Sequence, residues 1–296
     1  MLILGVDIGG TKIRGALFRD QTLLREKILP TGTTRRQTLN SLDEVLSELI
    51  QRGVRGIGIG YPGVITQEGK IIFHGCIPTL KGVNLITEIN RHHTLPVYTD
   101  NDANCFALAE ARYGAGRTVK NMIGLIIGTG VGCGIVLDGK LWSGEYGAAG
   151  EIGHSVVDSS SSLECFCQGG KGHLAGLVGG PGIVARYKLN GGKIENPDPA
   201  QVFASKEPAA IETMEDTYRY IGMGVSHLVN TLDVSHIVLG GGISHLPRAF
   251  YLKAQQAINH YACRVQGRKV KFVKHRLLEM NAGVIGAAAL VNLPAL

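Results

Sequence analysis

A run of carboxylate and amide side chains, Asp100-Asn101-Asp102-Ala103-Asn104, follows a strand-like segment and opens a helical one. One such residue could simply cap the helix, but three exceed what a cap needs. A carboxylate can accept the proton of a substrate hydroxyl, and an amide can orient that hydroxyl. Asp102 suits the first role and Asn101 the second, with helix capping as the structural alternative.

A second polar cluster lies in the tight turn Gly150-Glu151-Ile152-Gly153-His154. Its glycines leave Glu151 and His154 as the two side chains with hydrogen-bonding groups. Both could reach one ligand from such a turn.

Three glycine clusters each follow a strand-like run. Glycine lets backbone N–H groups approach a phosphate without a side chain in the way, although one cluster alone is more often a plain turn. The dinucleotide fingerprint G-x-G-x-x-G is not met at Gly128 or Gly130, and Leu141 stands where a Walker A loop requires Ser or Thr. The three clusters are Asp7-Ile8-Gly9-Gly10-Thr11-Lys12, Gly128-Thr129-Gly130 and Gly240-Gly241-Gly242.

The elements that must position these residues alternate between strand-like and helical patterns, which predicts an α/β protein. The hairpin pattern of residues 2–18 recurs at residues 122–137 and indicates an internally duplicated architecture. Strands are also expected at 56–60, 95–99 and 237–239, and helices at 38–50, 103–113, 209–232, from about 247, and at 282–291. Residues 155–182 are expected to be irregular. We place the lobe boundary at 117/118, giving lobes 1–117 and 118–296, with the C-terminal helix able to pack back on the first lobe.

Composition limits the classes of partner. The chain has 296 residues, a net charge of +6 and no run of five basic residues, so we expect a mildly basic surface and no nucleic-acid partner. Asp7 interrupts the place of a secretory apolar region, and five glycines break the longest uncharged run, 121–137, so no membrane segment is expected. Six scattered cysteines indicate a reducing, cytoplasmic location.

The order of the three glycine clusters resembles the actin, hexokinase and Hsp70 superfamily. With the motifs at 60–63, 101–104 and 150–154, the chain is identified as a member of the ROK family (repressors, open reading frames and sugar kinases) and resembles its fructokinase and N-acetylhexosamine kinase branch. The resemblance implies an actin-like ATPase (ribonuclease H-like) fold with two lobes and a cleft between them. It also implies ATP-dependent phosphorylation of the primary (6-) hydroxyl of a hexose or N-acetylhexosamine, commonly by a homodimer.

The same resemblance assigns roles residue by residue. It makes Asp102 the base, and Asp7 the residue that holds Mg²⁺, usually through water. Thr11 and Lys12 would lie near the γ-phosphate. The remaining glycine-cluster residues would hold ATP: Gly9, Gly10, Gly128, Thr129 and Gly130 the phosphates, and Gly240, Gly241 and Gly242 the adenosine. The sugar would contact Gly63, Asn101, Glu151 and His154.

The family's zinc motif is altered in this chain. Cys165 and Cys167 stand where the family has its first two cysteines, and His173 replaces the third, one residue later. Because cysteine and histidine both ligate zinc, His154, Cys165, Cys167 and His173 are expected to form a structural zinc site. The alternative is an empty, reduced pair of cysteines.

Two polar contacts of the family are missing. Cys76 and Ala175 stand where the family places an asparagine and a glutamate that bond sugar hydroxyls, and Gly179 replaces a frequent serine. A pocket without such partners loses discrimination, so weak selectivity for glucose is expected. Two other functions were weighed: a repressor, opposed because Asp7 is the seventh residue and leaves no room for a preceding DNA-binding domain, and a non-catalytic sugar or nucleotide sensor, opposed by Asp102.

Overall fold

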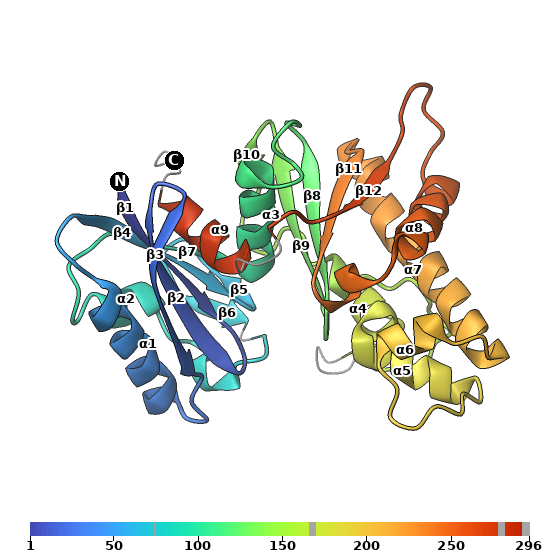
Figure 1. Cartoon of the computed structure of the whole chain (residues 1–296), viewed down its shortest axis with the longest axis horizontal. Coiled ribbons are helices and arrows are strands. Elements are labelled where there is room, and N and C mark those ends of the chain that lie inside the picture. The colour runs from blue at the N-terminus through green and yellow to red at the C-terminus, as the bar shows by residue number, and fades with distance from the viewer. Residues whose placement is uncertain (74, 166–169, 278–281, 292–296) are drawn as a thin grey trace. The chain divides into compact units, whose positions relative to one another are not determined.

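The computed structural model describes residues 1–73, 75–165, 170–277 and 282–291, and the chain divides into two compact units. Unit 1 comprises residues 1–114, 141–149 and 277–296, and unit 2 comprises residues 115–140 and 150–276. The expected division had one cut, at 117/118. The chain crosses between the units four times. The C-terminal segment packs with residues 1–114, as the expected division allowed, and the short segment 141–149 packs there as well, which was not expected. Figure 1 labels the elements of both units.

Unit 1 is built on a five-stranded sheet in the order β3-β2-β1-β4-β7. The first three strands form antiparallel pairs, whereas β1, β4 and β7 run parallel. The parallel strands therefore end at one edge of the sheet. The strands are β1 (Leu2–Ile8), β2 (Lys12–Arg19), β3 (Thr22–Pro30), β4 (Val54–Tyr61) and β7 (Val97–Asn101), and a separate two-stranded sheet pairs β5 (Val64–Ile65) with β6 (Ile71–Phe73).

Helix α1 (Arg35–Leu49) shows why these elements form where they do. Thr34 and Gln37 make a capping box at its start, which satisfies backbone N–H groups of the first turn. Apolar residues at helical spacing, among them Leu42, Leu46 and Leu49, face the sheet and are buried. The other helical elements of unit 1 are η1 (Pro78–Leu80), α2 (Leu85–Ile89), α3 (Asp102–Tyr113) and α9 (Ala282–Leu290).

Helix α9 packs on the sheet at unusually short range because glycines line its path. A Cβ at Gly58 would lie 1.7 Å from the carbonyl oxygen of Ala287, and one at Gly5 would lie 2.2 Å from that of Val284. Gly286 in turn approaches the carbonyl oxygen of Cys105 on α3. Figure 1 shows α9 beside α3 and the first sheet. This packing places the start of α3, with its polar residues, beside the end of β4.

Unit 2 repeats the strand order of unit 1. Its sheet runs β10-β9-β8-β11-β12, with β8 and β9 antiparallel and β8, β11 and β12 parallel. Each strand therefore has a counterpart in the first sheet, as the recurring hairpin pattern predicted. The strands are β8 (Met122–Ile127), β9 (Val131–Leu137), β10 (Lys140–Leu141), β11 (His236–Gly240) and β12 (Lys271–Lys274).

The helices of unit 2 pack around a buried arginine. Arg186 donates to the carbonyl oxygens of Leu177 and Thr213 and so joins three helices. Burial lowers its pKa to about 10. The helical elements are η2 (Ile152–His154), α4 (Leu174–Val178), α5 (Gly180–Leu189), α6 (Pro199–Ala204), α7 (Pro208–Leu232), η3 (Gly242–His245) and α8 (Arg248–Tyr261). Within the described ranges, no helix is both long enough and apolar enough to cross a bilayer.

Most expected elements are confirmed to within a few residues. The helix expected at 38–50 is α1, and the hairpin pattern expected at 122–137 is formed by β8 and β9 with the same outer bounds. The expectation that residues 155–182 are irregular is wrong at its C-terminal end, where α4 and the start of α5 lie. Their sequence is short and glycine-rich, so its helical character depends on burial in unit 2.

Candidate functional site

The turn between β1 and β2 is braced by the chain that follows β3. The N–H of Gly9 donates to the carbonyl oxygen of Lys12 at 2.9 Å, and the hydroxyl of Thr31 donates to the carbonyl oxygen of Gly9 at 2.6 Å. The N–H of Thr31 donates to the carbonyl oxygen of Thr11 at 3.0 Å. Gly10, Thr11 and Lys12 are exposed. The turn thus offers accessible backbone and one ammonium group, which suits phosphate oxygens.

Three aspartates gather where the parallel strands of unit 1 end. Asp7 on β1 pairs in register with Gly60 on β4, and Gly60 pairs with Asp100 on β7. Adjacent strands lie about 4.8 Å apart, so Asp7 and Asp100 are separated by about 10 Å. A Cβ at Gly60 would lie 3.8 Å from the Cα of Asp102. Asp102 therefore lies in contact range of the sheet edge at Gly60.

The buried thiol of Cys105 lies against Gly60, close to these carboxylates. Burial raises the pKa of Cys105 well above its ordinary value, and Asp100, Asp7 and Asp102 raise it further. All three carboxylates therefore act on one buried point beneath the sheet edge. This arrangement brings together Asp7 and Asp102, which the sequence singled out separately.

Asn101 is the N-cap of α3. Its Oδ1 accepts the N–H groups of Ala103 at 2.8 Å and Asn104 at 3.3 Å, and its Nδ2 donates to the carbonyl oxygen of Gly63 at 3.1 Å. The cap that the sequence left as an alternative role is present. An Nδ2 group carries two protons, so this carboxamide can hold the turn and still offer one donor to a ligand.

Cys76 lies against the first glycine turn. A Cβ at Gly10 would lie 3.0 Å from its Sγ, so thiol and turn are in contact. Partial burial of the thiol and then the Asp102 carboxylate raise the pKa of Cys76. The residue that departs from the family pattern therefore stands beside both the turn and Asp102.

Unit 2 brings its two glycine clusters side by side. Gly240 pairs with Ile126 near the end of β8, and a Cβ at Gly241 would lie 2.4 Å from the carbonyl oxygen of Ile127. The N–H of Gly128 donates to the carbonyl oxygen of Gly130 at 3.0 Å. The residues after β11 thus adjoin the turn after β8. The side chain of Thr129, at the tip of that turn, is exposed.

The Glu151–His154 turn rests on β9. A Cβ at Gly150 would lie 1.9 Å from the carbonyl oxygen of Cys133, and one at Gly153 would lie 2.4 Å from that of Val131. The Glu151 carboxylate lies 3.3 Å from Nε2 of His154. Burial and then Glu151 raise the pKa of Cys133 to about 12. The two glycines therefore let the turn that carries Glu151 and His154 lie directly against β9.

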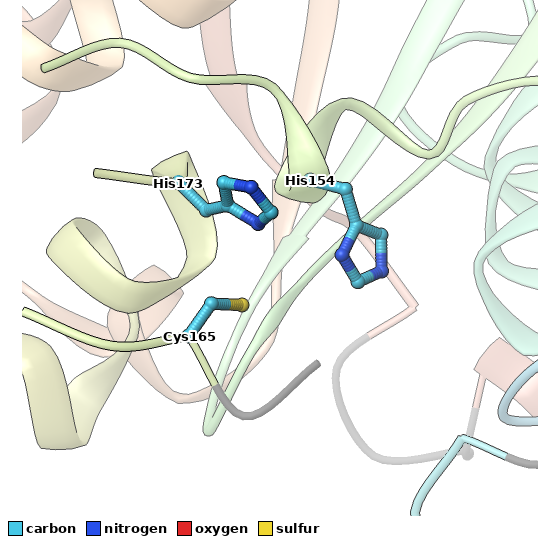
Figure 2. A group of neighbouring side chains, drawn as sticks. All are labelled: His154, Cys165 and His173. Atoms are coloured by element: carbon cyan, nitrogen blue, oxygen red, sulfur yellow. The ribbon is translucent and has the colours of Figure 1, made fainter. Parts of the chain in front are cut away.

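A histidine and cysteine cluster lies beside this turn. The ligand atoms of His154, Cys165 and His173 all lie within 4.8 Å of one another, and Figure 2 shows their side chains gathered around one space. A Cβ at Gly170 would lie 1.9 Å from the His173 ring, so this glycine makes room for the ring. Cys167, the other expected ligand, lies outside the described residues.

The remaining departures from the family pattern fall on α4 and its end. Ala175 is buried in α4 with 7% of its surface exposed, which leaves little room for a longer side chain. A Cβ at Gly179 would lie 2.5 Å from the carbonyl oxygen of Thr129, and the N–H of Gly180 donates to the carbonyl oxygen of Gly128 at 2.8 Å. The start of α5 thus supports the second glycine turn.

Sequence reasoning missed Thr31, which braces the first turn, and Ser143, whose hydroxyl donates to Asp100 at 2.9 Å. Neither residue stands in a recognisable motif. Each bonds to a residue more than twenty positions away, so no local signal could have identified it.

Comparison with known proteins assigns the family. The family model described as "ROK family" matches residues 3–293, and the chain belongs to that family. An N-acetyl-D-glucosamine kinase of Histophilus somni is 30% identical over 303 residues, covering 97% of this chain and 97% of the relative.

Solved structures agree in fold. The ROK hexokinase of Thermus thermophilus has a TM-score of 0.84 and 29% identity, covering 98% of this chain and 97% of its own. A ROK family glucokinase of Streptomyces griseus, in complex with glucose and AMPPNP, has a TM-score of 0.81 and 26% identity, covering 98% of this chain and 99% of the glucokinase chain. The chain has the actin-like ATPase fold of these neighbours.

Proposed function

We propose that this protein transfers the γ-phosphate of ATP to the primary (6-) hydroxyl of a hexose or an N-acetylhexosamine. The enzyme class follows from its relatives, and the chain is an ATP-dependent sugar kinase of the ROK family. The observation that carries the finer proposal is the position of Asp7 and Asp102 beside the same residue, Gly60, at the sheet edge that holds the first glycine turn. One carboxylate can serve a metal ion while the other serves as a base.

Asp102 is the proposed base. As the sugar oxygen O6 attacks the γ-phosphorus, its proton passes to the Asp102 carboxylate, and the bond from phosphorus to the bridging oxygen breaks to release ADP. Oδ1 of Asp102 accepts the N–H of Ala103 at 2.8 Å, which fixes the orientation of the carboxylate at the start of α3.

The nucleotide is assigned to the glycine clusters. In unit 1, Asp7 would hold Mg²⁺ through water, and Gly9 to Lys12 would face the γ-phosphate. In unit 2, residues 128–130 would hold phosphates and residues 240–242 the adenosine. The contact between Gly241 and Ile127 supports one continuous nucleotide surface in unit 2. When bound, Mg²⁺ would neutralise charge on the transferring group.

A structural zinc ion fits the cluster of His154, Cys165 and His173. Two imidazoles and one thiol within 4.8 Å supply three of the four ligands of a tetrahedral site. Cys167, two residues after Cys165, is the proposed fourth. The ion would fix the segment that follows Glu151, and no step of the reaction needs it.

The sugar is assigned to Gly63 and Asn101 in unit 1 and to Glu151 and His154 in unit 2. These residues offer a carbonyl, an amide, a carboxylate and an imidazole, which suit ring hydroxyls. Cys76 stands beside Asp102 where the family has an asparagine that bonds a sugar hydroxyl. The loss of this amide supports a phosphate acceptor other than glucose. The relative from Histophilus somni, named for N-acetyl-D-glucosamine, supports the same direction. A homodimeric, cytoplasmic enzyme remains the expectation from the resemblance.

The test is a coupled ADP-release assay with ATP and Mg²⁺ over glucose, fructose, mannose, N-acetylglucosamine and N-acetylmannosamine. We expect sugar-dependent ADP release with at least one of them. The phosphorylated position is then read from the product by NMR. A sensor would bind ATP and sugar without release, and phosphorylation at another hydroxyl would contradict the 6-hydroxyl assignment.

A further inference from the structure

Asp100 joins two separate pieces of unit 1 through three hydrogen bonds. Its Oδ1 accepts the N–H of Asn101 at 2.7 Å and the Nδ2 group of Asn104 at 2.6 Å. Its Oδ2 accepts the hydroxyl of Ser143 at 2.9 Å, 43 residues further along the chain. One carboxylate therefore links the start of α3 to segment 141–149, which enters unit 1 as a separate piece.

The partners of Asp100 depend on it. Asn104 is 1% exposed, its amide donates to Asp100, and its Oδ1 has no hydrogen-bond partner among the residues that the structure describes. Loss of the carboxylate would leave the buried Nδ2 group of Asn104 without this acceptor, next to the turn that carries Asp102. The carboxylate itself is desolvated, and burial raises the pKa of Asp100.

Segment 141–149 borders the same end of unit 1 as Asn101. Gly147 has a φ of 73°, and a Cβ there would lie 2.7 Å from the carbonyl oxygen of Ile65 on β5. That strand begins directly after Gly63, which accepts a hydrogen bond from Asn101. The segment also carries Trp142, the only tryptophan of the sequence, with 56% of its surface exposed.

We propose that Asp100 is a positioning residue for the sugar site: through Ser143 it holds segment 141–149 against the turn of Asn101 and Asp102. This inference rests on the proposed kinase function. Asp100 acts by accepting hydrogen bonds and contributes no required charge. An asparagine can do the same, because its Oδ1 can accept the bonds from Asn101 and Asn104 while its Nδ2 donates to the Ser143 oxygen.

The experiment compares Asp100→Ala, Asp100→Asn and Ser143→Ala with wild type in full-length protein. Ser160→Ala is the matched control, because Ser160 donates to the Asp158 carboxylate at 2.6 Å in unit 2. KM values for sugar and for ATP are measured beside kcat. Trp142 anisotropy and acrylamide quenching report the mobility of the segment without turnover.

We expect Asp100→Ala and Ser143→Ala to raise the sugar KM by about tenfold, as loss of a buried hydrogen bond implies. The ATP KM should change by less than about twofold, because Asp100 lies two strands and about 10 Å from Asp7 and none of its three hydrogen bonds involves a proposed nucleotide residue. Trp142 should show lower anisotropy and faster quenching. Asp100→Asn should restore both readouts to within about threefold of wild type, and Ser160→Ala should match wild type.

Two results would overturn the inference: an Asp100→Asn variant as impaired as Asp100→Ala, or an unchanged sugar KM and Trp142 signal in both alanine variants. If Asp100→Ala does not fold, Ser143→Ala decides, because it removes only one hydroxyl. If the wild type phosphorylates no sugar, the proposed function fails, while the Trp142 comparison still decides whether the bond fastens the segment.

Discussion

Gly241 offers a sharp test of the nucleotide residues in unit 2. Its backbone has φ 79° and ψ −178°, a region that is almost exclusive to glycine and costs another residue about 1–3 kcal/mol. A Cβ would also lie 2.4 Å from the carbonyl oxygen of Ile127. The backbone would have to shift by about 0.6 Å to reach even 3.0 Å, the shortest distance that real Cβ atoms show. Gly241→Ala therefore combines strain with displacement of the glycine cluster.

We expect Gly241→Ala to lower the free energy of unfolding by about 2 kcal/mol, which for a chain of 296 residues corresponds to a Tm lower by about 3 °C. Displacement by a large fraction of an ångström should raise the ATP KM by about tenfold or more, with the sugar KM within about twofold. The assays are thermal denaturation and ADP release at varied ATP and varied sugar.

The neighbouring glycine supplies the control. A Cβ at Gly242 would meet no atom within 4 Å, and its φ lies outside the left-handed region. Gly242→Ala should therefore leave the Tm unchanged. A Gly241→Ala variant with wild-type Tm and ATP KM would refute the reasoning, as would an equal loss of Tm in both variants.

Three further predictions follow from the other parts of the site. Purified protein should contain about one zinc ion per chain, and His173→Ala should lose it together with several degrees of Tm; a metal-free, folded and active wild type would contradict the zinc assignment. Wild type should prefer glucose by less than about tenfold in kcat/KM, and Cys76→Asn should shift the preference toward glucose; a wild-type preference of about a hundredfold would refute this view of the pocket. Burial raises the pKa of Asp100, so folding favours the protonated form of this side chain. The stability that it contributes is therefore complete below pH 3.8, the ordinary pKa of aspartate, and is lost as the pH rises through the raised pKa. The Asp100→Asn variant lacks this ionisation. Its free energy of unfolding minus that of wild type, both from urea titrations, should therefore be larger at pH 8 than at pH 4. An equal difference at the two pH values would contradict the assigned direction of the Asp100 pKa shift.

The sequence alone was sufficient to predict features that depend on neighbouring residues. Glycines after apolar runs predicted the turns after β1, β8 and β11, because each run reads as a strand and each cluster as a turn. The run from Asp100 to Asn104 likewise predicted both the start of a helix and the polar side chains of the candidate site. These features are set by neighbouring residues, so one sequence suffices to find them.

The rest depended on contacts between distant residues. The register that aligns Asp7 with Asp100 passes through Gly60 on an intervening strand, and no motif encodes it. Ser143 joins Asp100 only because segment 141–149 packs with unit 1. Cys76 was noted for what it replaces, and its contact with the first glycine turn is visible only in the fold. Such placements follow from tertiary packing rather than local pattern.

The central claim, that Asp102 is the base of a sugar kinase, is tested most directly by kcat of Asp102→Asn with the best sugar. The substitution keeps the size of the side chain and an acceptor for the Ala103 N–H, so the fold and ATP binding should persist. We predict a kcat at least about a hundredfold below wild type, because a general base contributes about that much or more. A variant that binds ATP normally and retains more than about a tenth of the wild-type kcat would contradict the assignment.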